Sequence, residues 1–118
     1  MDLTLGTTTY RLVATERSDQ HVAHALRSDS NERFGIETTG GTAEEAIARL
    51  RLWLEWQHEH TQALEALQQA EKVYHRAMAD AAFSTSIDVG AAGSRTSLDA
   101  VNAARTTLDD VRARRPNV

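Results

Sequence analysis

The first forty residues alternate between hydrophobic and polar positions, which is typical of β-strands. Residues 7–15, 21–27 and 33–39 each combine this alternation with β-branched or aromatic side chains. Polar turn sequences separate them at Ser18-Asp19 and at residues 28–31. Because the connections are short, the pattern predicts three strands in an antiparallel meander.

The period then changes to that of a helix. Gly40-Gly41 gives the backbone freedom to turn, and Thr42 and Glu45 fit a reciprocal capping box. In such a box the Thr42 hydroxyl accepts the Glu45 backbone N–H, while the Glu45 carboxylate accepts the Thr42 N–H. Residues 43–81 contain no Pro or Gly, which predicts one long helix. At 1.5 Å per residue it reaches ~55 Å, longer than a compact domain of this size is wide, so its distal half needs a partner.

The C-terminal third supplies that partner. Residues 83–97 contain Gly90, Gly93 and several Ser and Thr, which favours a loop, with a short strand hairpin over 85–89 as the alternative. A second helix is predicted over 98–114, because its apolar residues form one stripe: Leu98, Val101, Leu108 and Val111. Pro116 ends it.

These elements predict an α+β fold: a three-stranded antiparallel meander packed on a long α-helix, followed by a C-terminal helix that forms a helical hairpin. Gln57, His60 and Glu71 interrupt the large apolar residues of the long helix, which argues against a regular coiled coil. We therefore expect two parts, a strand-rich unit at 1–57 and a helical extension at 58–118.

Two helices alone form a thin core, so we expect self-association into a dimer or larger homo-oligomer. The predicted interface combines apolar residues of the hairpin with one tryptophan: Trp56, Leu64, Leu67, Tyr74, Met78, Leu98, Val101, Leu108 and Val111. Trp53 is interpreted as core, whereas for Trp56 core and interface remain equal alternatives.

Composition narrows the class of function. Apolar residues make up 41% but aromatic residues only 5%, so alanine supplies much of the apolar content. The absence of cysteine excludes disulfides and thiolate chemistry, and together with the lack of a signal or membrane-spanning segment it predicts a cytoplasmic protein. A net charge of −4 does not favour nucleic-acid binding, and the arginines at 112, 114 and 115 are interpreted as a helix C-terminal cap.

The histidines do not form a metal or catalytic motif. His58 and His60 are two apart and point about 200° apart on a helix, and Gln62 stands where a zinc-protease signature needs its second histidine. His24 lies on a strand face between apolar residues and is interpreted as a partly buried structural histidine. We predict no catalytic residue, no metal and no cofactor, and therefore a non-enzymatic protein.

Residues 9–57 resemble the HicB-like antitoxin fold. The resemblance is carried by the order of strands, by Val22-Ala23-His24 in the second of them, and by Gly41-Thr42-Ala43-Glu44-Glu45-Ala46, which opens a helix with Ile47, Leu50 and Leu54 at helical spacing. It implies a small protein that forms homo-oligomers and binds a small toxin partner. The longer polar loop at 28–33 and the C-terminal half depart from the family pattern.

Leu67 to Met78 form a helical stretch that contains Tyr74-His75, and the alternative strand hairpin and the helix from Leu98 follow it. On these features residues 64–111 are similar to the gpW-like phage head–tail joining proteins, which have a helix, a strand hairpin and a second helix. This similarity implies a structural adaptor of a phage particle as the alternative function. The sequence thus predicts a protein-interaction module that self-associates through its hairpin, with antitoxin-like binding of a small partner or an adaptor role.

Overall fold

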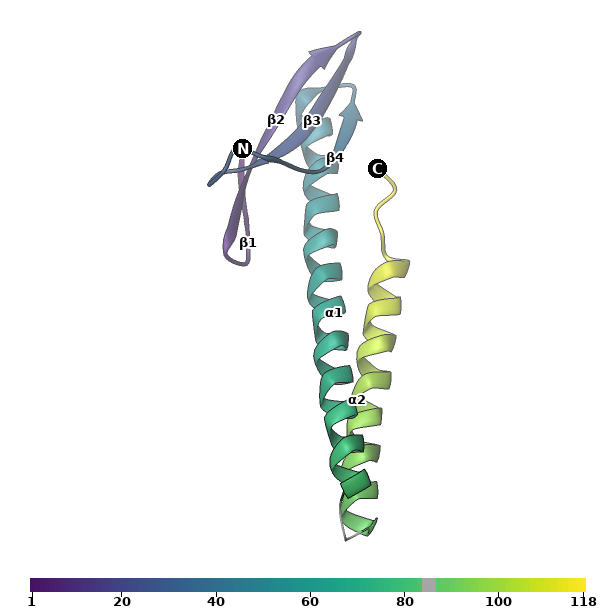
Figure 1. Ribbon diagram of the computed structural model, residues 1–118. Coiled ribbons are helices and arrows are strands. Elements are labelled where there is room, and N and C mark those ends of the chain that lie inside the picture. Colours follow the sequence, from purple (N-terminus) through teal and green to yellow (C-terminus); the bar gives the residue numbers. More distant parts are fainter. Residues whose placement is uncertain (84–86) are drawn as a thin grey trace. The chain divides into compact units, whose positions relative to one another are not determined.

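The computed structural model describes residues 1–83 and 87–118, and in it four strands precede two helices (Figure 1). The strands are β1 (Asp2–Leu5), β2 (Thr8–Arg17), β3 (Gln20–Arg27) and β4 (Arg33–Gly40), and the helices are α1 (Ala43–Phe83) and α2 (Ile87–Ala113). The chain divides into two compact units: unit 1 is Met1–His58 with Arg115–Val118, and unit 2 is Glu59–Arg114. The α+β class is confirmed.

Within the described residues the sheet has four strands, so the predicted count of three is wrong. All neighbouring strands pair antiparallel in the order β1-β2-β3-β4. The additional strand β1 pairs with β2, with Leu3 opposite Tyr10. Four residues are too few to establish an alternating pattern, and β1 is held by its ladder and by Leu3 in the core. This explains why hydrophobic periodicity did not reveal it.

One face of the sheet packs against the first half of α1. Ala23 and Ala25 are completely buried on this face, and their small side chains let the helix approach the sheet closely. The core of unit 1 joins residues of three strands to residues of the helix: Leu3, Tyr10, Leu12, Ala23, Ala25, Ala46, Leu50, Trp53 and Leu54. A buried hydrogen bond of 2.6 Å from Thr38 Oγ1 to the Ala46 carbonyl ties β4 to the helix.

The helix cap differs from the prediction in one partner. The Glu45 backbone N–H donates to Thr42 Oγ1 at 3.1 Å, as expected for an N-cap. The Glu45 carboxylate instead accepts the Gly41 N–H at 3.2 Å, so the reciprocal bond lies one residue earlier than in the standard box. Glu45 also forms an ion pair with Arg49, at 3.2 Å.

Replacing Thr42 by alanine is expected to lower the free energy of unfolding by about 1 kcal/mol, because the Glu45 N–H loses its side-chain acceptor. Thr61→Ala, at an exposed position inside α1, is the matched control and should be neutral or slightly stabilising. Urea denaturation followed by circular dichroism compares them. An equal loss in both variants would show that Thr42 does not act as a cap.

The second helix begins much earlier than predicted. It starts at Ile87 rather than Leu98, so a loop over the whole of 83–97 is wrong. Phe83 belongs to α1, and residues 87–89 belong to α2. The alternative strand hairpin over 85–89 is therefore wrong at 87–89, while its residues 85 and 86 lie, with residue 84, outside the described residues. Gly90 and Gly93 each cost a helix about 1 kcal/mol, but alanines stand between them, and propensity is readily overridden by the surrounding fold.

Candidate protein-interaction surfaces

The two helices of unit 2 pack along a regular seam that runs through small residues. In α1 the seam residues alternate in spacings of three and four: His60, Ala63, Leu67, Ala70, Tyr74 and Ala77. In α2 the same spacing is followed by Ser97, Val101, Ala104, Leu108 and Val111. Each of these side chains is buried or partly buried. His60 and the alanines occupy seam positions themselves, so the seam continues where the large apolar residues are interrupted.

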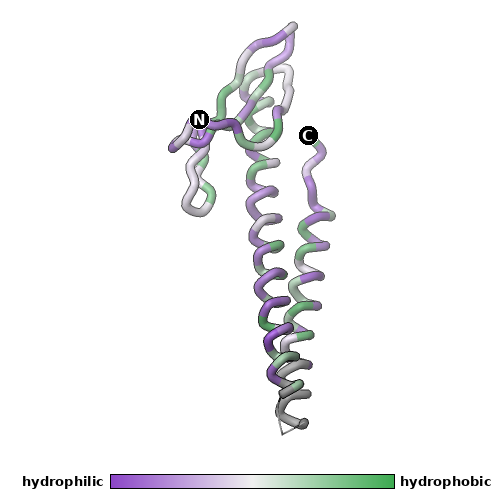
Figure 2. The backbone as a smooth tube through the Cα atoms, in the orientation of Figure 1, coloured by the Kyte–Doolittle hydropathy of each residue, from purple (hydrophilic) through white to green (hydrophobic). Residues whose placement is uncertain are grey.

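This seam contains part of the predicted interface. Four of its residues are buried within the chain's own hairpin: Leu67, Val101, Leu108 and Val111. Leu64, Tyr74 and Trp56 are partly buried, and Met78 and Leu98 are exposed. Figure 2 shows the corresponding alternation, with green segments recurring among purple ones along the two helices. The residues still accessible to a partner are therefore those beside the seam.

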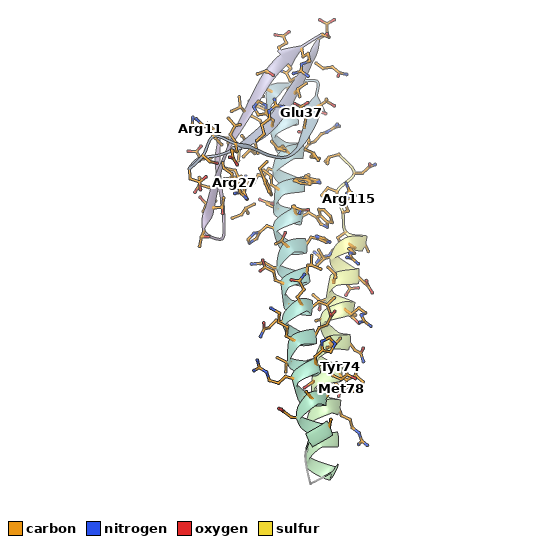
Figure 3. The ribbon with its side chains drawn as sticks, in the orientation of Figure 1. Arg11, Arg27, Glu37, Tyr74, Met78 and Arg115 are labelled. Carbon is orange, nitrogen blue, oxygen red and sulfur yellow. The ribbon has the colours of Figure 1, made fainter. Side chains whose placement is uncertain are left out.

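One side of the hairpin carries an apolar edge, which we define as Leu64, Met78 and Leu98. Each follows directly after a seam residue, as do Glu71, Arg105 and Arg112 on the same side. Met78 is 49% exposed and Leu98 is 40% exposed, and Met78 lies one turn beyond Tyr74 on α1 (Figure 3). The apolar edge thus shares its side of the hairpin with one acidic and two basic residues.

The opposite edge of the hairpin is more polar. Glu59 Oε2 and Arg114 Nη1 form an ion pair across it at 3.3 Å. Val73 lies on this edge and is exposed. Glu59 precedes the seam of α1 and Arg114 directly follows the end of α2, so their pairing agrees with two antiparallel helices.

Trp53 is held in the core of unit 1 and faces Gly35 in β4. It is 8% exposed, and the prediction that it belongs to the core is confirmed. A Cβ at position 35 would lie 2.5 Å from the Trp53 ring, so the ring packs directly on the backbone of the strand. The indole Nε1 on the other edge of the ring has no hydrogen-bond acceptor among the described residues.

A pocket lies beside Trp53 within unit 1. Its volume is about 330 Å³, and it is lined by Ile36, Trp53 and the C-terminal segment Arg115–Val118. The Arg115 guanidinium stands over the Trp56 ring, 5.6 Å from its centroid (Figure 3 labels Arg115). We call the pocket wall formed by Ile36 and Trp53, together with the Trp56 ring that lies under Arg115, the tryptophan groove, and we call Arg115–Val118 the tail.

The C-terminal arginines therefore do more than cap a helix end. Arg112 Nε donates to His60 Nε2 at 3.5 Å, Arg114 pairs with Glu59, and Arg115 stacks on Trp56. The sequence signal for these contacts was only the clustering of three arginines, because residues more than fifty positions apart in the chain come together.

His58 and His24 lie at positions that suggest no catalytic role. The His58 ring approaches Gly6 in the turn between β1 and β2, where an added Cβ would lie 3.2 Å from it. His24 lies opposite Val13 on the sheet face that α1 does not cover. A second pocket, of about 340 Å³, is formed by Thr7, Thr8, Thr9, Ser28 and Asp29. His24 lines neither this pocket nor the pocket beside Trp53. Among the described residues no group of three His, Asp or Glu side chains could hold a metal ion.

The two helices differ from membrane-spanning segments. Within residues 1–83 and 87–118, neither helix combines the length and the apolar composition needed to cross a bilayer.

Comparisons of the chain with protein families, with curated proteins and with solved structures found no match.

Proposed function

We propose that this protein is a non-enzymatic interaction module that self-associates through the apolar edge of its helical hairpin. The observation that carries the proposal is the exposure of Met78 and Leu98 on the same side of the hairpin as Leu64. A hairpin of two helices buries only the seam between them, and large apolar side chains beside the seam are what a further pair of helices would cover.

The charges along the apolar edge support a second copy of the chain as the partner. Glu71 on α1 and Arg105 on α2 stand on this edge between the hydrophobic residues. In a two-fold symmetric dimer the same edge meets itself, so Glu71 of one protomer can approach Arg105 of the other. Because the seam is rich in alanine, each helix buries little apolar area within one hairpin. Packing two hairpins into a four-helix arrangement would increase the apolar area buried per helix.

Introducing a charged side chain at the apolar edge tests the proposal. Met78→Glu and Leu98→Glu are each expected to raise the dimer dissociation constant by about 30-fold or more, because a carboxylate would be buried in the interface. Val73→Glu is the matched control, since Val73 is equally exposed but lies on the opposite edge. Sedimentation velocity over a concentration series measures the effect.

Two results would contradict the proposal. One is a wild-type chain that sediments as a 13.0 kDa monomer at about 50 micromolar or more, a concentration chosen to exceed a weak Kd. The other is dissociation by Val73→Glu with no effect of the two edge substitutions. Circular dichroism on each variant establishes that the hairpin remains helical.

Unit 1 carries the second part of the proposal, antitoxin-like binding of a small protein partner. It is supported by the resemblance of residues 9–57 to HicB-like antitoxins, in which strands precede a helix opened by the stretch found at Gly41–Ala46. A small basic toxin encoded in the adjacent gene, and its co-purification with this chain, would be expected. Phage morphogenesis genes in that position would favour the structural adaptor instead.

A further inference from the structure

The tail is an imperfect occupant of the tryptophan groove. Trp53 Nε1 finds no acceptor in the described part of the chain, and a pocket of about 330 Å³ stays open between Trp53, Ile36 and the tail. Arg115, Asn117 and Val118 are themselves exposed, and only Pro116 of the tail is partly buried. The tail therefore lies against Trp53 and Ile36 without filling the pocket, and the Trp53 indole N–H has no acceptor among the described residues.

The chemistry of the groove selects one kind of segment. The Trp56 ring carries a guanidinium over its face, which is the arrangement that favours arginine. Pro116 follows directly and lines the pocket beside Trp53. An extended segment lacks internal hydrogen bonds, so its carbonyl oxygens are free to accept an indole N–H.

We propose that the tryptophan groove is a binding site for an extended Arg-Pro segment of a partner protein, and that the chain's own Arg115-Pro116 occupies it in the absence of that partner. A partner segment with a large apolar residue after the proline fills the open volume, and its backbone carbonyl accepts the Trp53 N–H. The tail then acts as a competitor that the partner displaces. This site lies in unit 1 and is independent of self-association by the hairpin.

The two indole N–H signals in a ¹H–¹⁵N spectrum of the full-length protein report on the groove, and Trp56→Phe assigns them. Arg115→Ala is expected to shift both signals, because it removes the guanidinium that holds the tail on Trp56. Arg114→Ala is the matched control: it removes the neighbouring arginine, whose partner is Glu59 in unit 2, and should leave both signals in place.

The probe is the acetylated hexapeptide Ala-Arg-Arg-Pro-Asn-Val, which repeats residues 113–118, together with a version that has Phe in place of Asn. The Arg115→Ala protein should bind the probe about threefold more tightly than wild type, because its own tail competes less well. The Phe version should bind about tenfold more tightly than the native sequence. In both complexes the Trp53 indole proton should move downfield, as expected for a new hydrogen bond.

Two outcomes would overturn the proposal. Unchanged indole signals in Arg115→Ala would show that the tail does not rest on the groove in solution. If neither peptide causes a saturable shift of the indole signals of the Arg115→Ala protein at millimolar concentration, the groove does not bind such segments. Neither outcome depends on the oligomeric state, so the result is separate from the test of the hairpin edge.

Discussion

Replacing Leu50 by alanine is expected to lower the free energy of unfolding by about 3 kcal/mol. Leu50 is completely buried, in the same cluster as Leu12 and Leu54, at the centre of the contact between α1 and the sheet. Removing its branched end loses the transfer free energy of the buried carbons and leaves a cavity that a sheet and a helix can only partly close. This is a large fraction of the roughly 5–15 kcal/mol that stabilises an ordinary domain.

Leu52→Ala provides the control for Leu50→Ala. Leu52 is on the same helix, two residues along, but is 55% exposed, so its truncation should change the free energy of unfolding by no more than about 0.5 kcal/mol. Both tryptophans of the chain belong to unit 1, and their fluorescence in a urea titration therefore follows the unfolding of this unit. Similar midpoints for the two variants would show that the helix does not pack on the sheet as described.

Gly35→Ala is expected to cost about 3 kcal/mol, an effect of similar size with a different physical cause. Gly35 has a φ of +82°, a backbone conformation that costs an L-residue about 1–2 kcal/mol. Its position also faces the Trp53 ring, at 2.5 Å from where the new Cβ would be. Since the ring is packed in the core, overpacking adds about 1–3 kcal/mol.

Gly41→Ala is the control that separates the positive φ and the Trp53 contact of Gly35 from a general effect of replacing glycine by alanine. Gly41 does not share the positive φ, and an added Cβ would meet only the flexible Glu45 carboxylate at 3.5 Å. The expected change is below about 1 kcal/mol. Urea midpoints measure both variants, and the position of the fluorescence maximum shows whether Trp53 has moved. A tolerated Gly35→Ala would mean that the Trp53 ring does not lie against β4.

The sequence was most informative where a pattern was long and chemically simple. The capping residue Thr42 and the long Gly- and Pro-free run locate α1 closely, from Ala43 to Phe83. The alternation over residues 7–15 correctly predicts the strand β2, in which Tyr10 and Leu12 are buried. Hydrophobic periodicity and capping chemistry are therefore enough to recognise three of the four strands and both helices.

The missing features share a dependence on contacts between distant residues. β1 is too short to have a pattern, and α2 extends through glycines that alone would favour a loop. The hairpin seam runs through alanines at 63, 70 and 77, which a search for large apolar residues overlooks, although their spacing of seven was a usable signal. The contact between Arg115 and Trp56 has no local signature at all.

The order of the strands has a consequence for synthesis of the chain. Each strand pairs only with its neighbours in sequence, and only two residues separate β1 from β2 and β2 from β3, while five separate β3 from β4. Short loops lose little entropy on closure, which favours rapid folding. All strands and the part of α1 that covers them are complete by His58, so the sheet and its helix can assemble on the ribosome while α2 is still being translated.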